Sequence, residues 1–280
     1  MFVKKTIVPV LASFLSGCGG VLDPRGPVGA SEKLILMDSL TIMLVIVVPV
    51  LLATLGFAWW FRASNARATY RPNWAFSGSL ELIVWAIPTL VITFLGGIAW
   101  FGSQALDPFR PLQSKLKPIE VEAVSLDWKW LFIYPDEGVA TVNQLVIAAG
   151  RPVHFRITSA TVWNAFFVPQ LGSMIYSMAG MTSQLNLQAD KPGTFRGLSS
   201  MFSGDKFSDM HFDVRAVGED AFDQWVDSAR QSGSVLDRAA YARLAGTADT
   251  APVSIYRSVD STLFQAIVAG TAPEPDQEHP

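Results

Sequence analysis

The chain has 280 residues and a formal net charge of −3; 50% of its residues are hydrophobic and only 16% are charged. Soluble proteins carry about 25% charged residues, so this composition argues against a purely soluble globular protein, a disordered chain and a coiled coil. The acidic net charge and the absence of a basic cluster leave a nucleic-acid partner without electrostatic support.

The first residues have the pattern of a bacterial lipoprotein signal. Two lysines at positions 4 and 5 precede an apolar stretch, which ends in Leu-Ser-Gly before Cys18, the one cysteine of the sequence. A basic start, an apolar core and small residues before a cleavage site are typical of a secretory signal, and the last four residues resemble a lipobox. We predict that residues 1–17 are removed and that Cys18 is acylated, for example by palmitate. The alternative is a free cysteine at the end of an uncleaved signal.

Two charge-free runs are long enough to cross a membrane. They extend over Ser39–Phe61 and Leu82–Leu106, and each exceeds the ~20 residues that a hydrocarbon core of ~30 Å requires. Tryptophans lie near the ends of these runs, as they do in interfacial aromatic belts. We predict transmembrane helices at residues 39–61 and 81–106, and an outer N-terminal segment at residues 18–38.

The loop between the two runs indicates their orientation. Residues 62–80 carry Arg62, Arg67 and Arg71 and no acidic residue, and the positive-inside rule places such a loop in the cytoplasm. A lipidated N-terminus on the outer side agrees with this orientation. The sequence therefore predicts a multi-pass lipoprotein of a bacterial inner membrane, with its C-terminal part in the periplasm. Glu81, beside the second run, is either a surface carboxylate or, if it faces another subunit, part of a proton path.

From about residue 118 the pattern changes to short strands punctuated by proline and glycine, which predicts an all-β sandwich or barrel at residues 107–218. By strict alternation, Trp128 and Trp130 lie on the same face of one strand. The expected strands are Ile119–Val124, Trp128–Tyr134, Gln144–Ala148, Val153–Ile157, Ala165–Val168, Gln184–Leu187 and Met210–Val214.

After residue 217 the spacing of apolar residues becomes helical, with Asp220 as a candidate N-cap. Further helices are expected at about Leu236–Leu244 and Ser258–Ile267, so that residues 219–268 form a C-terminal helical region. The proline-rich, acidic residues 269–280 are predicted to be disordered. The first of these helices is indicated by residues at i, i+3, i+4 and i+7, namely Phe222, Trp225, Val226 and Ala229.

The three histidines do not have the spacing of metal ligands. His154 falls within an expected strand, and His279 falls in the tail. His211 directly follows Met210, so strand alternation directs the two side chains to opposite faces. We therefore expect no metal site in this chain.

Several motifs resemble subunit II of the cytochrome bo-type ubiquinol oxidases, in the haem–copper oxidase superfamily. The resemblance extends from about residue 15 to about residue 244, and it implies a two-helix transmembrane hairpin followed by an all-β cupredoxin-like sandwich with a short C-terminal helical extension. The matching motifs are residues 15–18, 22–24, 56–59, 62–65, 72–74, 127–135, 140–143, 166–169, 175–181 and 221–226.

The resemblance also implies that a copper centre has been lost. In this superfamily, subunit II of the cytochrome c oxidases binds two copper ions, and only Met210 keeps the residue type of a ligand. Copper in such a centre requires thiolate sulfur, and Cys18 belongs to the anchor far along the chain. The corresponding positions of this sequence hold Asn164, Ser199, Met201, Ser203, Phe207 and Met210.

The function implied by the resemblance is that of a subunit of a proton-pumping quinol:O₂ oxidoreductase. Haems and copper are expected in subunit I and no cofactor in this chain. The chain is expected to be a structural and docking partner of subunit I, surrounded by membrane lipids, in a complex that uses ubiquinol and not cytochrome c. The resemblance places Glu81 near the mouth of a proton pathway. It places Trp128 and Trp130 in an aromatic segment facing subunit I, where we expect packing rather than electron transfer.

Two other functions are compatible with parts of the pattern. One is a copper-less subunit of a cytochrome c oxidase, which the missing ligands disfavour. The other is a copper-less, membrane-tethered cupredoxin module for binding or assembly, without a catalytic partner. The aromatic, weakly charged spans favour a subunit of a membrane complex over this second function.

Overall fold

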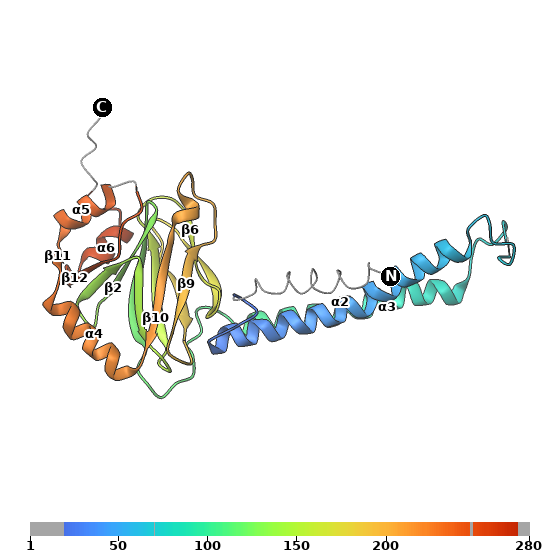
Figure 1. The fold of residues 1–280 in the computed structure, drawn as a ribbon, viewed down its shortest axis with the longest axis horizontal. Coiled ribbons are helices and arrows are strands. Elements are labelled where there is room, and N and C mark those ends of the chain that lie inside the picture. The colour runs from blue at the N-terminus through green and yellow to red at the C-terminus, as the bar shows by residue number, and fades with distance from the viewer. Residues whose placement is uncertain (1–19, 70, 247–248, 274–280) are drawn as a thin grey trace, which may run out of the picture. The chain divides into compact units, whose positions relative to one another are not determined.

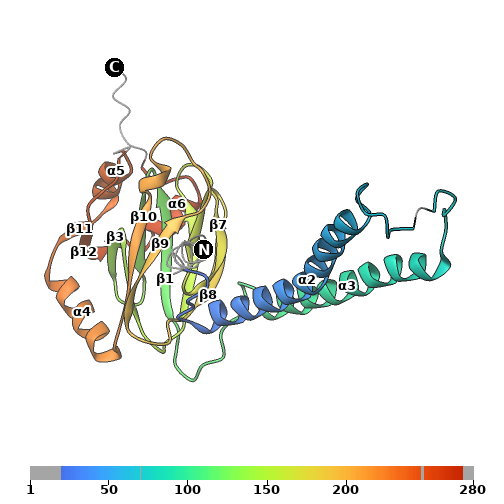
Figure 2. The same cartoon turned by 45° about the vertical axis from the view of Figure 1, so that its right-hand side comes forward.

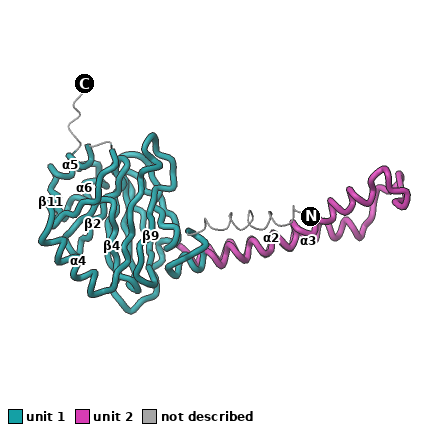
Figure 3. Tube along the Cα trace, in the orientation of Figure 1, with its two compact units in different colours: residues 1–32, 108–280 teal, residues 33–107 magenta. Residues whose placement is uncertain are grey.

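A computed structural model describes residues 20–69, 71–246 and 249–273. The chain divides into two compact units, one formed by residues 33–107 and the other by the residues on either side of that stretch (Figure 3). The predicted signal, Cys18 and His279 lie outside the described residues, as does most of the predicted disordered tail.

Two long helices dominate the stretch 33–107. Helix α2 covers Pro27–Trp60 and helix α3 covers Gly78–Ala105, and both are long and apolar enough to cross a membrane. Helix α2 begins well before the predicted start at residue 39, because a proline is well suited to the first helical position and the charged residues after it can continue a helix. The charge-free run marked only the part of the helix suited to lipid.

The other unit is a sandwich of two β-sheets (Figures 1 and 2). One sheet has seven strands in the order β11-β12-β3-β2-β1-β5-β8, and the other has five in the order β4-β10-β9-β6-β7. The strands are β1 Ile119–Leu126, β2 Lys129–Tyr134, β3 Val139–Val142, β4 Gln144–Ala148, β5 Val153–Ser159, β6 Asn164–Val168, β7 Gly172–Ser177, β8 Ser183–Leu187, β9 Gly193–Ser199, β10 His211–Val217, β11 Ser234–Leu236 and β12 Ser254–Val259.

The predicted sandwich is confirmed, and each predicted strand is present with ends that differ from the prediction by three residues at most. Within residues 107–218, strands β3, β7 and β9 were not predicted. Strand β9 contains two glycines, a threonine and an arginine, so it lacks a clear apolar alternation. It forms because β6 and β10 pair with it on either side.

An aromatic core joins the two sheets. Trp130 and Phe132 on β2 face Phe166 on β6 and Phe212 on β10, and the Phe166 and Phe212 rings stack with centroids 5.2 Å apart. The buried hydroxyl of Tyr134 donates to the Val146 carbonyl at 3.0 Å and accepts from the Val146 amide at 2.8 Å. The sheets are thus joined by apolar packing and by a bridge whose buried polar groups are satisfied.

The C-terminal region contains strands as well as helices, which corrects the prediction of a helical region at residues 219–268. Strand β12 pairs with β3, and β11 pairs with β12, so the region extends the seven-stranded sheet. The third expected helix is therefore divided between β12 and a short helix. The helices are α4 Glu219–Gln231, α5 Arg238–Gly246 and α6 Leu263–Val268.

Helix α4 buries three of the four residues with helical spacing, Phe222, Val226 and Ala229. Its N-cap is Gly218 rather than the predicted Asp220, which lies within the first turn. An acidic residue in the first turn still interacts favourably with the positive end of the helix dipole. Asp220 therefore fits the helix start without capping it.

The C-terminal elements cover the face of the seven-stranded sheet that points away from the other sheet (Figures 1 and 2). Leu131 and Ile133 of β2 pack there against a cluster that includes Leu263, Phe264 and Ile267 of α6. Because both faces of β2 are buried, its sequence after Lys129 is a continuous apolar run rather than an alternation.

The first turns of α2 are bound to the sandwich. The amide of Gly29 donates to the Leu171 carbonyl at 3.0 Å, and Glu32 accepts hydrogen bonds from both the amide and the hydroxyl of Ser173 at 2.9 Å. Gly172 requires its glycine, because its φ is +106° and an added Cβ would lie 2.6 Å from the Gly29 amide nitrogen. These contacts hold the first turns of α2 against the β6–β7 hairpin.

Candidate functional site

The positions assigned by resemblance to a copper centre come together at one end of the five-stranded sheet. Asn164 begins β6, Ser199 ends β9, and Met210 immediately precedes β10. These three side chains are buried. The Ser199 hydroxyl donates to the Asn164 side-chain oxygen at 3.1 Å, and the Ser199 amide donates to the Met210 carbonyl at 3.2 Å. The side chains of Ser199 and Asn164 are therefore hydrogen-bonded to each other at positions where a copper centre would have its ligands.

The remaining three positions lie in the connection between β9 and β10. The carbonyl of Met201 lies 3.4 Å from the Ser199 hydroxyl. Ser203 is in the loop, where its buried hydroxyl has no hydrogen-bond partner among the described residues. Phe207 begins a single 3₁₀ turn, Phe207–Asp209, and its ring packs edge-on against Phe202 at 5.7 Å.

These donors do not fit a dinuclear copper centre. Such a centre needs soft thiolate and imidazole ligands, whereas this site offers an amide, two hydroxyls and two thioethers. No group of three or more His, Cys, Asp or Glu side chains able to hold a metal ion occurs in the described part of the chain.

The two tryptophans of the predicted interface have different surroundings, which corrects the prediction that they share a face. Trp128 lies in the turn between β1 and β2 with a φ of 63°, so strand alternation begins only at Lys129. Its ring lies over Gly204, where an added Cβ would be 2.7 Å from a ring carbon. Trp130 is fully buried in the aromatic core. Trp130 therefore cannot contact another subunit, whereas half-buried Trp128 borders the β9–β10 loop.

The C-terminal segment is attached to this loop by charged side chains. Lys206 of the loop forms an ion pair with Asp249 at 2.7 Å. The buried ammonium of Lys129 donates to the carbonyls of Asp249 and Asp127, each at 3.2 Å. Burial lowers the pKa of Lys129, and the nearby carboxylates of Asp127 and Asp249 oppose that shift. Sequence reasoning missed this attachment, because Asp249 is distant along the chain.

An exposed apolar patch adjoins the same end of the sheet. The rings of Trp163 and Tyr176 pack edge-on with their centroids 5.0 Å apart. Ser200, which lies two residues before Phe202 in the chain, donates a hydrogen bond to the Met174 sulfur. Met174 and Tyr176 are two positions apart on β7 and are both exposed on the same face. This spacing of two large apolar residues could have been recognised in the sequence. The exposed apolar patch consists of Val162, Trp163, Met174, Tyr176 and Phe202, which are between 40% and 76% exposed.

Family models and relatives identify the chain. The model described as the periplasmic domain of cytochrome c oxidase subunit II matches residues 136–217, and the aromatic-rich motif model of these oxidases matches residues 230–270. The cytochrome bo(3) ubiquinol oxidase subunit 2 of Pseudomonas putida is 46% identical over 94% of this chain and 84% of its own. The ubiquinol oxidase subunit 2 of Acetobacter aceti is 47% identical over 92% and 85%. The chain belongs to the subunit II family of ubiquinol oxidases.

A solved structure of lower similarity is the periplasmic domain of cytochrome oxidase subunit II from Bradyrhizobium japonicum. It is 24% identical, with a TM-score of 0.40, and the alignment covers 42% of this chain and 98% of that one.

As a ubiquinol oxidase subunit II, the chain is part of an oxidoreductase complex of electron transport, together with other oxidase subunits. The two candidate membrane helices and the periplasmic domain fit a membrane-anchored subunit. Glu81 lies in the first turn of α3, where its amide donates to the Ser77 carbonyl at 3.0 Å and its side chain is exposed.

The two histidines in the described part of the chain, His154 and His211, have ordinary structural surroundings. His154 is within hydrogen-bond distance of Glu120, with 2.7 Å between the ring nitrogen and a carboxylate oxygen. His211 is exposed at the start of β10, whereas Met210, which precedes the strand, is buried.

Proposed function

We propose that this subunit II docks on the haem-bearing subunit I of a quinol:O₂ oxidoreductase and carries no redox cofactor itself. The single observation that carries the proposal is the donor set at the degenerate copper positions, where Asn164 and Ser199 bond to each other. Without thiolates the domain has no entry point for electrons from cytochrome c. Electrons from ubiquinol then reach the haems and copper of subunit I without passing through this chain.

The exposed apolar patch supports docking at the end of the sandwich that holds the degenerate copper positions. Contiguous exposed apolar surface marks interaction sites in proteins, and aromatic residues are enriched in interface cores. Phe202 is 76% exposed, and Trp163 is 48% exposed. We propose that this patch, with Trp128 beside the β9–β10 loop, packs against subunit I.

The proposed topology is that of a multi-pass lipoprotein of the inner membrane. Helices α2 and α3 cross the bilayer, the arginine-bearing loop between them is cytoplasmic, and the sandwich is periplasmic. Residues 1–17 are a signal, and Cys18 carries the lipid. Membrane lipids surround α2 and α3 at the surfaces that other subunits leave free.

The first expected result concerns the assembled complex. The tagged full chain should co-purify with a haem-bearing subunit, and the complex should consume O₂ with ubiquinol as the reductant. Reduced cytochrome c should not replace ubiquinol, because the subunit has no copper centre to receive its electrons. Oxygen uptake driven by cytochrome c would contradict the copper-free function. Recovery of the chain without a haem-bearing partner would favour the membrane-tethered binding or assembly module.

Glu81 is proposed to lie at the entry of a proton pathway of the complex, a role implied by the resemblance and compatible with its exposed side chain in the first turn of α3. Glu81→Gln removes a proton-carrying group from a helix end, so ubiquinol turnover should fall several-fold while assembly is unchanged. The matched control is Asp38→Asn in α2, which should leave turnover at the wild-type rate. Equal turnover of the Glu81→Gln complex and the wild type would remove the claim.

A further inference from the structure

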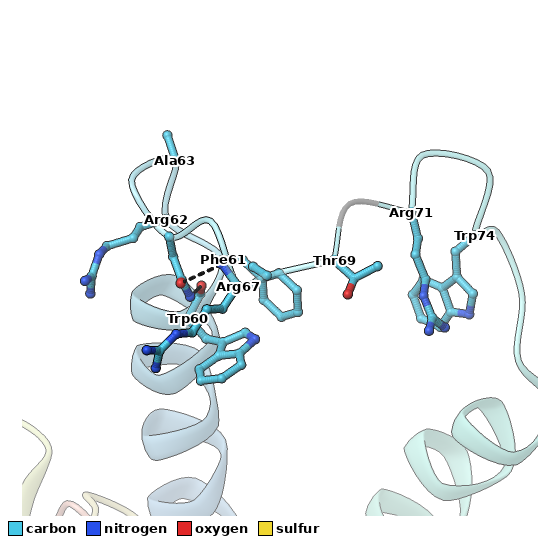
Figure 4. A pocket seen from close by; sticks show the side chains of 10 residues that line it. Trp60, Phe61, Arg62, Ala63, Arg67, Thr69, Arg71 and Trp74 are labelled. Carbon is cyan, nitrogen blue, oxygen red and sulfur yellow. Dashed lines mark hydrogen bonds between the residues drawn. The ribbon is translucent and has the colours of Figure 1, made fainter.

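The connection between α2 and α3 forms an open pocket of about 760 Å³ (Figure 4). Three arginines and two tryptophans contribute to its wall, and no acidic side chain does so among the described residues. The lining residues are Trp60, Phe61, Arg62, Ala63, Asn65, Arg67, Ala68, Thr69, Arg71 and Trp74.

Hydrogen bonds at the end of α2 shape one side of the pocket. The Asn65 side chain donates to the Trp60 carbonyl at 2.5 Å and accepts from the Arg67 amide at 3.2 Å. The Arg62 guanidinium donates to the Ser64 hydroxyl at 3.0 Å and lies 5.0 Å from the centre of the Trp59 ring. This side of the pocket is therefore built by specific contacts and does not depend on a ligand.

Two of the three guanidinium groups are available to a ligand. Arg67 and Arg71 are exposed, and within the described part of the chain their side chains form no ion pair and no hydrogen bond. Because the connection contains no carboxylate, its positive charge is not neutralised by the protein. A guanidinium fork matches a pair of oxygens of a phosphate or a carboxylate, so these residues suit a phosphate-bearing ligand.

The surroundings of the pocket identify the source of the phosphate. The pocket lies where two long apolar helices end, and Trp59, Trp60 and Trp74 are exposed there. Exposed tryptophans at the ends of apolar helices mark the level of lipid head groups, and basic residues there attract anionic lipids. We propose that this pocket binds the phosphate of an anionic phospholipid head group. The inference rests on the membrane-spanning arrangement given under the proposed function.

The test measures lipid retention on the full chain purified in detergent, with phosphatidylglycerol as the probe and phosphatidylcholine as the zwitterionic comparison. Native mass spectrometry should show phosphatidylglycerol bound to the wild type in preference to phosphatidylcholine. The double variant Arg67→Gln/Arg71→Gln should bind phosphatidylglycerol about tenfold more weakly or worse, since it loses both available cations. Equal binding by the variant, or no preference for phosphatidylglycerol, would overturn the proposal.

Two further variants test whether the effect depends on the location of the arginines and on the geometry of the guanidinium group. Arg196→Gln/Arg215→Gln makes the same change of charge on exposed arginines of the sandwich and should leave phosphatidylglycerol binding unchanged. Arg67→Lys/Arg71→Lys keeps the loop charge that orients the helices, and its binding should be intermediate, because lysine lacks the bidentate fork. Displacement of the lipid by inorganic phosphate at equal concentration would show a general anion site and overturn the lipid assignment. None of these measurements requires subunit I, so their failure is separable from a failure of ubiquinol oxidation.

Discussion

Replacing Trp130 by alanine should destabilise the β-sandwich by about 3–5 kcal/mol, the cost of truncating a large side chain in a packed core. Trp130 is fully buried, and its ring lies 5.4 Å from that of Phe166 and 5.7 Å from that of Phe212. Its indole nitrogen has no hydrogen-bond partner among the described residues, so alanine leaves no polar group without its partner. The loss is therefore one of packing, measurable by guanidinium unfolding of the full chain in detergent.

Trp128→Ala is the matched control for this change. Trp128 is half-buried in a turn over Gly204, so its truncation should cost clearly less folding free energy than that of Trp130. It should instead weaken association with the haem-bearing subunit, since the proposed docking surface includes Trp128. Equal losses of stability in the two variants would contradict the different roles that burial assigns to them.

A second large effect is expected at the exposed apolar patch. In the double variant Val162→Asp/Phe202→Asp, two side chains that are 49% and 76% exposed would carry charge into the proposed interface. Desolvating unpaired carboxylates is costly, and interface hot spots contribute about 2 kcal/mol or more. Co-purification of the haem-bearing subunit should therefore fall at least tenfold, while the unfolding transition of the sandwich remains at the wild-type midpoint.

The control for the patch is Val235→Asp/Val253→Asp, which adds the same charge at positions that are 40% and 50% exposed in the C-terminal region. This variant should assemble as the wild type does. If both double variants assemble normally, the patch is not a docking surface. If both fail equally, added charge alone is responsible and the location of the patch is irrelevant.

The degenerate copper positions show what residue identity can predict about a site and what it cannot. Asn164, Ser199 and Met210 were selected by resemblance, and the structure brings them into contact through the pairing of β6, β9 and β10. That these positions lack thiolates follows from residue identity alone. The hydrogen bond by which Ser199 and Asn164 satisfy each other could not be predicted, because it depends on the register of strand β9, which sequence reasoning did not find.

At the predicted interface of Trp128 and Trp130, by contrast, the sequence pattern led to a wrong prediction. The spacing of Trp128 and Trp130 is that of one strand face, but the left-handed backbone of Trp128 ends the alternation between them. A single φ angle thus separates a core residue from a surface residue. The same limit applies to β12, which was expected to be part of a helix. Its partner β3 is more than a hundred residues away along the chain, and local spacing carries no information about such a pair.

Local chemistry was sufficient to identify two apolar helices, an arginine-bearing loop, a sandwich of short strands and a donor set without thiolates, because each depends on residue identity and spacing along one segment. Tertiary structure alone decided which tryptophan is buried and which exposed side chains form a patch. It also decided that the C-terminal region extends the sheet. These features arise from contacts between distant segments, whose free energy depends on how surfaces fit together and not on the pattern of any one of them.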